Sequence, residues 1–300
     1  MRITCLTITL FLCLARTAAF ATEDPDYSEA GHGHFFVSYQ FIHVDGFEAT
    51  TGELPIGTTD THTLNFELDY QLNDRWGFDI GIPLVRKRYQ GPGAHNPALI
   101  IPPQDSKFID DGEYHTDFQD WHLAVRYRLR DDDWRIEPFA ALGVPSNDYP
   151  FFAHAAVGQN LLKFDVGSRF IYTPPISDAW YRLDVSYVFV EETLGTNIDH
   201  WRVNGEAGYF FSPRLSARVF FLLKEGNGLD FPDDFPPPRN DFYWYQHDRM
   251  VKHNYINAGL GLDWTLNDRY QLSFSWMTMV HADQVHIMKY AFTLGIARSF

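Results

Sequence analysis

The chain has 300 residues, of which 17% are aromatic, and its formal net charge is −15. A net negative charge argues against nucleic acid as a partner and against attraction of anions to the exterior. Beyond the first residues no window holds the roughly 20 apolar residues of a transmembrane helix, so a helical membrane protein is excluded.

The segment 1–21 has the composition of a secretory signal peptide. A basic residue precedes an apolar run from Ile3 to Leu14, and Ala19-Phe20-Ala21 is a small-x-small cleavage site. We expect a mature chain that starts near Thr22, with a short periplasmic segment at 22–33 and a barrel at 34–300. Loss of the signal peptide leaves 22 basic and 39 acidic residues, a net charge of −17.

Both cysteines, Cys5 and Cys13, lie in the segment that is removed. No disulfide or thiol chemistry is therefore expected in the mature chain.

Apolar and polar side chains alternate along most of the mature chain. Leu64, Phe66 and Leu68 face one way, a tight turn follows at 73–75, and the alternation restarts at Trp76. This pattern predicts a strand, a turn and a second strand. Twelve strands are predicted in this way, at 35–43, 64–72, 76–82, 121–129, 134–144, 162–172, 181–189, 201–211, 215–223, 256–266, 270–280 and 290–300.

The predicted connections alternate strictly between five short turns and six long loops. The long loops are expected at 45–60, 86–117, 145–160, 190–200, 225–253 and 281–287. Short periplasmic turns, long extracellular loops and an even strand number are typical of outer-membrane barrels. We predict an all-β, transmembrane, antiparallel up-and-down β-barrel of about 12 strands. A soluble β-sandwich fits poorly, because the outward-facing positions of the closed sheet would expose Trp, Phe and Leu to water.

The last strand ends on an aromatic residue, Phe300, which follows Leu294 and Ile296 on one face. An aromatic C-terminus on an alternating strand is typical of bacterial outer-membrane barrels and is the assembly signal for them. We therefore expect the protein in the outer membrane of a Gram-negative cell. Its expected partners are the barrel-assembly machinery, outer-membrane lipid and lipopolysaccharide.

Where the apolar positions face lipid, the positions between them line the lumen. The predicted lumen-lining residues are Glu67, Asp69, Asp79, Arg126, Arg128, Glu137, Lys163, Asp165, Arg169, Arg182, Asp184, Arg202, Glu206, Arg218 and Asp263. Two interpretations stay open: the charges set up a field across an open path, or they pair with one another in a narrow interior. Twelve strands lie between side-chain-filled barrels of about eight strands and porins of sixteen or more, so any pore is narrow.

The predicted loop at 225–253 is rich in aromatic residues and proline. The run Phe242, Tyr243, Trp244 and Tyr245 is expected to form a lid over the mouth, because exposed aromatic rings are costly in water. The predicted loop at 86–117 contains a second apolar segment, 99–101, that could constrict the lumen.

Thirteen histidines raise the question of a metal site. The densest groups are His32 with His34, and His281 and Asp283 with His286, but their spacing matches no standard zinc signature. We expect no metal and no cofactor. A lipid hydrolase of the outer membrane would use a His-x-Ser pair, and no histidine here is followed two residues later by serine.

Segment 117–128 reads D-F-Q-D-W-H-L-A-V-R-Y-R, and segment 141–148 reads A-L-G-V-P-S-N-D. They resemble the "G-D-x-x-L-x-x-K-Y-R" strand and the "L-G-x-x-x-P-T-G-D" strand end of the outer-membrane transporter family named for the meta-pathway of phenol degradation. Segment 209–215, Y-F-F-S-P-R-L, resembles its "G-Y-x-x-T-D-x-L" turn. Gln119 stands where glycine is usual, and Ser146-Asn147 replaces Thr-Gly.

The resemblance extends over most of the mature chain. It implies a transporter-like barrel, associated with aromatic catabolism and related in concept to long-chain fatty-acid channels, and it carries no established catalytic residues. We predict a channel for passive diffusion of small molecules, with hydrophobic or aromatic compounds as candidate solutes, and not an enzyme. The alternatives are a lipid-modifying outer-membrane enzyme and a closed barrel with a structural or adhesive role.

Overall fold

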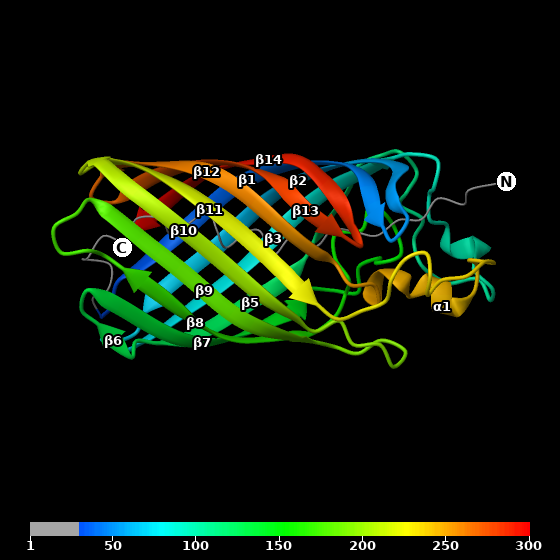
Figure 1. Ribbon diagram of the computed structural model, residues 1–300, viewed down its shortest axis with the longest axis horizontal. Coiled ribbons are helices and arrows are strands. Elements are labelled where there is room, and N and C mark those ends of the chain that lie inside the picture. The colour runs from blue at the N-terminus through cyan, green and yellow to red at the C-terminus, as the bar shows by residue number, and fades with distance from the viewer. Residues whose placement is uncertain (1–29) are drawn as a thin grey trace.

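The computed structural model describes residues 30–300, so the predicted signal peptide and cleavage site lie outside the described part of the chain. One antiparallel sheet closes on itself to form a barrel (Figure 1). Its twelve barrel-forming strands are β1 (Gly33–Ala49), β2 (Gly52–Gln71), β3 (Trp76–Gln90), β5 (Asp120–Tyr127), β7 (Trp134–Pro145), β8 (Lys163–Tyr172), β9 (Ala179–Val190), β10 (His200–Ser212), β11 (Leu215–Gly226), β12 (Asn254–Asn267), β13 (Tyr270–Asp283) and β14 (Val285–Ser299). The predicted fold class and strand number are confirmed.

Two short strands lie in line with β5. β4 (His115–Phe118) pairs with β3 before β5 begins, and β6 (Arg130–Asp131) pairs with β7 after β5 ends. The other elements of the described chain are short: the 3₁₀ helices η2 (Pro97–Leu99) and η3 (His247–Arg249) and the helix α1 (Phe242–Tyr245). Within residues 30–300, no helix has the length and apolar character to cross a membrane.

The first and last strands close the barrel. β1 pairs with β14 from His34 opposite Ser299 onward, and Gly33 and Phe300 exchange both backbone hydrogen bonds at 3.0 Å. The ring of Phe300 stacks on Tyr70 at a centroid distance of 6.4 Å. The C-terminal residue is thus part of the closing seam, and its role as an assembly signal stays a prediction.

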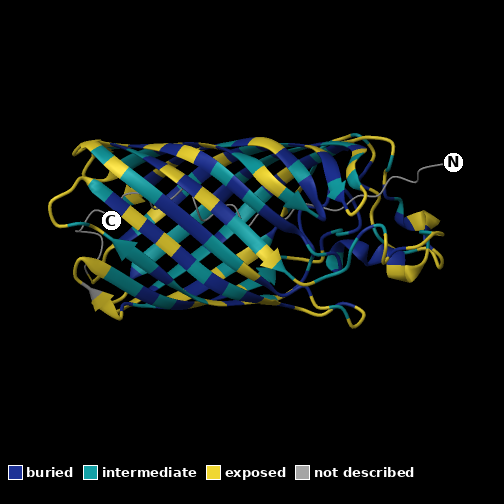
Figure 2. Cartoon of the chain, viewed as in Figure 1, coloured by how far each residue is buried: buried dark blue, intermediate teal, exposed yellow. Residues whose placement is uncertain are grey.

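Burial alternates along the strands as the two-residue pattern predicts (Figure 2). In β11, Leu215, Val219 and Phe221 are exposed, whereas Ser216 and Arg218 are buried. An apolar exterior around a polar interior is the arrangement of a membrane barrel and the reverse of a water-soluble one.

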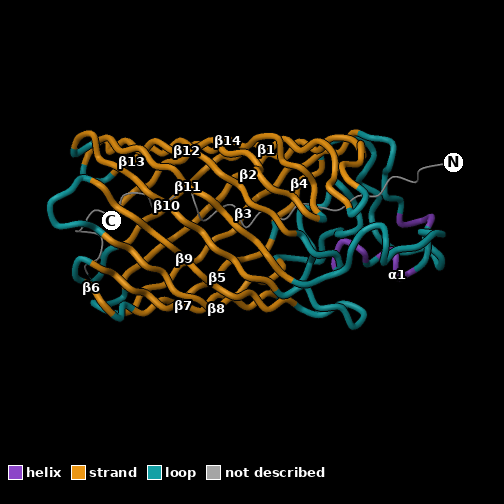
Figure 3. Tube along the Cα trace, viewed as in Figure 1, coloured by secondary structure: helices purple, strands orange, loops and turns teal. Residues whose placement is uncertain are grey.

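The long connections gather at one end of the barrel, together with the short helices (Figure 3). We call this the loop end, and the opposite end, with the tight turns and the C-terminus, the turn end. Four long connections are present at the loop end, at 91–114, 146–162, 191–199 and 227–253.

Two predicted loops are wrong, because 45–60 and 281–287 are mostly strand. β1 and β2 stay paired up to Ala49 opposite Gly52, and only Gln284 separates β13 from β14. Gly46, with a φ of 83°, occupies a bulge between the paired residues Asp45 and Phe47. A bulge places a glycine inside a continuous strand, where the sequence alone indicates a loop.

Candidate functional site

The predicted lumen charges form a network of ion pairs inside the barrel. The pairs are Arg126 with Asp69 and Asp79, Arg128 with Glu137, Arg169 with Glu137 and Asp184, Arg182 with Asp184, Arg202 with Asp165, Arg218 with Glu206 and Asp263, and Lys163 with Asp120. Most of these residues lie in the half of the barrel nearer the turn end. We call them the charge network.

Shared carboxylates make the network continuous over several strands. Glu137 lies 3.3 Å from Arg128 and 3.9 Å from Arg169, and Asp184 lies 3.3 Å from Arg169 and 2.6 Å from Arg182. Charges removed from water are stable only when they are paired and hydrogen-bonded. The pairing supports the interpretation that the charges neutralise one another in a narrow interior.

Of the predicted lumen residues, Glu67 is half-buried and packs against Gly81 on the neighbouring strand. A Cβ added at Gly81 would lie 3.0 Å from the Cγ of Glu67. The sequence prediction missed Asp120, which accepts a 2.9 Å hydrogen bond from Lys163 and a short one from Tyr149. Asp120 stands six residues before Arg126, on the same strand face, so the alternation itself could have identified it.

The interior is not polar throughout. Toward the loop end, inward-facing residues of β1, β11, β12, β13 and β14 form an apolar cluster that we call the apolar wall. It comprises Ile42, Val44, Phe220, Leu222, Tyr255, Met277, Val285, Met288 and Ala291. A small cavity beside β1, β2 and β3 is lined mainly by polar side chains instead, among them Gln40, Thr61, Thr63, Asn65 and Lys87.

The loops pack together above the barrel as what we call the loop cap. Its apolar core comprises Phe47, Ala49, Ile56, Ile100, Phe152, Phe231, Phe235, Trp244, Tyr245, Met250 and Val251. These side chains come from the β1–β2 hairpin and from three of the long loops. The cap is therefore a packed unit whose parts are distant in sequence.

The predicted lid is divided between the inside and the outside of this cap. Trp244 and Tyr245 are buried, whereas Phe242 and Tyr243 are 43% and 38% exposed. The side chain of Asp241 accepts a 2.7 Å hydrogen bond from the Trp244 amide and so caps the short helix α1. In the second apolar segment, 99–101, only Ile100 lies in the core of the loop cap.

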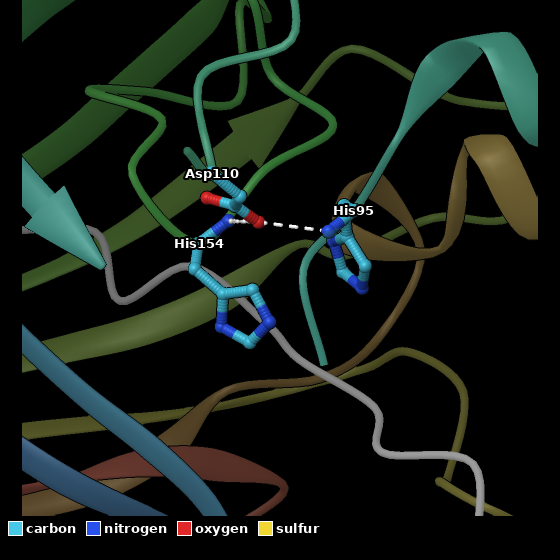
Figure 4. A group of neighbouring side chains, drawn as sticks. All are labelled: His95, Asp110 and His154. Atoms are coloured by element: carbon cyan, nitrogen blue, oxygen red, sulfur yellow. Dashed lines mark hydrogen bonds between the residues drawn. The ribbon is translucent and has the colours of Figure 1, made fainter. Parts of the chain in front are cut away.

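Buried polar groups lie among the cap's aromatic rings. Asp110 accepts hydrogen bonds from the backbone amides of His95 and His154, each at 3.0 Å (Figure 4). It also accepts one from the backbone amide of Ala155 at 2.9 Å. Burial raises the pKa of Asp110 to about 6, although these hydrogen bonds act in the opposite direction. The carboxylate thus joins the loop 91–114 to the loop 146–162.

The histidines that converge in the cap are largely not those that the sequence singled out. His281 is exposed, and Asp283 pairs with Lys252 at 3.2 Å. Only His286 of that group lies in the cap, 5.8 Å from His154 between ring centroids. His32 and His34 lie where β1 begins, at the turn end.

No family model and no curated protein sequence matches this chain. Among solved structures, the chain is similar to the COG4313 outer membrane channel from Pseudomonas putida F1. The TM-score is 0.69 at 14% identity, and the match covers 93% of this chain and 100% of that one. Two further matches have a TM-score of 0.51: the NanC porin, with 8% identity over 89% of this chain and 98% of that one, and the translocator domain of the autotransporter NalP from Neisseria meningitidis, with 12% identity over 92% and 90%. These likenesses establish the fold, that of outer-membrane barrels.

Proposed function

We propose that the protein is an outer-membrane channel through which small molecules diffuse passively. The observation that carries the proposal is the closed twelve-stranded barrel with an apolar exterior and a charged, ion-paired interior. A membrane barrel of this size encloses more space than a side-chain-filled barrel of about eight strands. The similar fold of an outer membrane channel supports the same function.

The proposed path has three zones. A solute enters through the aromatic loop cap, passes between the apolar wall and the polar side of β1–β3, and leaves through the charge network. We propose small aromatic compounds as the favoured solutes, because the cap and the apolar wall offer rings and methionines to a flat apolar group. The family resemblance points to the same class.

The membrane partners follow from this proposal. The exposed apolar side chains would contact outer-membrane lipid, and the ends of the barrel would contact lipopolysaccharide on one side and the periplasm on the other. Phe300, at the closing seam, is the residue that the barrel-assembly machinery would recognise.

Swelling of proteoliposomes tests the proposal. Liposomes with the refolded protein should swell in isotonic arabinose and should not swell in the larger sugar stachyose. L-Phenylalanine should enter faster than L-glutamine, which has a similar polar end but no ring. Absence of swelling in every solute would favour the lipid-modifying enzyme or the closed structural barrel. Equal rates for the two amino acids would reject the aromatic preference alone.

A further inference from the structure

Histidine and aspartate side chains from three separate loops meet inside the loop cap. His95 comes from the loop 91–114, His154 from the loop 146–162, and His247 and Asp248 from η3 in the loop 227–253. One potential ligand atom each of His95, His247 and Asp248 lies within 4.8 Å of the other two, and the same holds for His95, Asp110 and His154. All five side chains are buried.

The hydrogen bonds of two of these histidines fix which ring nitrogen carries the proton. Nδ1 of His247 lies 2.7 Å from the carbonyl oxygen of Trp244, and Nε2 of His154 lies 2.9 Å from that of Gly93. A carbonyl oxygen can only accept, so these nitrogens donate, and in a neutral ring the lone pair then lies on the opposite nitrogen. Metal-binding histidines are oriented by such a bond to a backbone carbonyl.

His95 provides an independent observation. Its side chain is 5% exposed, and among the described residues, 30–300, neither Nδ1 nor Nε2 has a hydrogen-bond partner. Its ring stacks on Phe152 at 4.6 Å and meets the ring of His247 edge-on at 5.0 Å. A buried polar ring held in this way calls for a ligand, since buried polar groups are otherwise hydrogen-bonded.

The two aspartates lie against different groups. Asp110 accepts three backbone hydrogen bonds and serves to join two loops. Asp248 lies beside His247, with Oδ1 at 3.3 Å from Nε2. The set of His95, His247 and Asp248 therefore brings together two imidazoles and one carboxylate, the donor types that Zn²⁺ takes in sites with an open position.

We propose that the loop cap binds one divalent transition-metal ion of the zinc type through His95, His247 and Asp248, with Nδ1 of His154 or water next to it. Binding would join the loop 91–114 to the loop 227–253 at a point where the structure has no covalent link. Where the protein acts as the proposed channel, the ion would hold the cap closed over the mouth. The metal site itself does not depend on that function.

Zinc binding to the refolded, EDTA-treated protein in detergent tests the proposal. We expect one Zn²⁺ per chain by competition with a chromophoric chelator, and Co²⁺ should give the intense visible absorption of a site with four or five ligands. His95→Gln and Asp248→Asn should each weaken Zn²⁺ binding by at least about tenfold. His281→Gln, which changes an exposed histidine on β13, is the matched control and should bind as the parent does.

Heat-modifiable migration on gels shows whether each variant has formed its barrel. A folded His95→Gln protein that binds Zn²⁺ as tightly as the parent would overturn the proposal, as would a parent that binds none. Zn²⁺ binding without any solute uptake would keep the site and reject the channel function. Solute uptake without Zn²⁺ binding would reject the metal site and keep the channel function.

Discussion

Residues on the two faces of a strand lie in opposite environments, and the sequence predicts which environment most residues have. Counting in steps of two from one charged residue identifies the inward face, as it does for Arg126 and Arg218. The same count places Phe220 and Leu222 on the inward face, but it does not reveal that they join an apolar cluster with residues of four other strands. Which acid pairs with which base depends on strand register and could not be predicted.

The first prediction concerns how deep in the membrane an outward-facing residue lies. Leu260 lies in the middle of β12, and Leu266 lies on the same face near the tight turn; both are exposed. Leu260→Arg should destabilise the folded barrel in lipid by about 2–4 kcal/mol, and Leu266→Arg by about 0–1 kcal/mol, because the cost of a charge falls toward the interface. Urea unfolding in vesicles measures both. Equal costs at the two positions would contradict the assigned membrane depth.

Arg218 sets the second prediction, since its buried guanidinium lies near both Asp263 and Glu206. Arg218→Gln should cost about 3–5 kcal/mol, because it leaves carboxylates in the interior without their cation. Adding Asp263→Asn should recover part of that loss. A double-mutant cycle by urea unfolding measures the coupling, and strictly additive costs would show that the pair contributes nothing as a pair.

At the scale of elements, strands were predictable and the cap was not. Alternation places eight of the twelve strands to within three residues at each end, whereas β1, β2, β3 and β14 extend further than predicted at the loop end. Glycine, proline and threonine in 45–60 indicate a loop, but pairing with a long neighbouring strand outweighs these local preferences. The cap rests on contacts such as that of Phe47 with Phe231, 6.2 Å between centroids, which no local pattern reveals.

The buried half of α1 holds the cap together, which gives the third prediction. Trp244→Ala should loosen the cap and raise the swelling rate of proteoliposomes in arabinose, because Trp244 packs on Phe235 and His247. Tyr243→Ala, on the exposed side of the same helix, is the control and should change the rate little. If both variants swell at the parent's rate, the cap does not cover the mouth and the prediction is wrong.

His253, in the loop 227–253, gives the fourth prediction. Burial, helped by the charge of Lys224, holds its pKa well below 6.5, so the folded protein keeps it neutral. The unfolded state binds the additional proton below pH 6.5, so the cap's stability is full above that pH and is lost as the pH falls. With EDTA present, limited proteolysis of the cap should accelerate below pH 6.5. His253→Asn should reduce this dependence, and an unchanged pH profile would contradict it.

The whole molecule is a membrane barrel whose interior changes character along its axis. An aromatic cap with buried histidines stands at the loop end, the apolar wall faces a polar side below it, and the charge network occupies the turn-end half. The predicted lumen residues comprise seven bases and eight acids, so the paired interior carries little net charge. A narrow path with balanced charge should pass small solutes and select weakly between cations and anions.

Single-channel recording in planar bilayers tests this account most directly. The refolded protein should give small, discrete conductance steps, with a reversal potential close to zero in a KCl gradient, and Trp244→Ala should give larger steps. Strong anion or cation selectivity would contradict the balanced charge network. An absence of steps from both proteins, after gel migration has shown folded barrels, would contradict the central claim that this barrel is a channel.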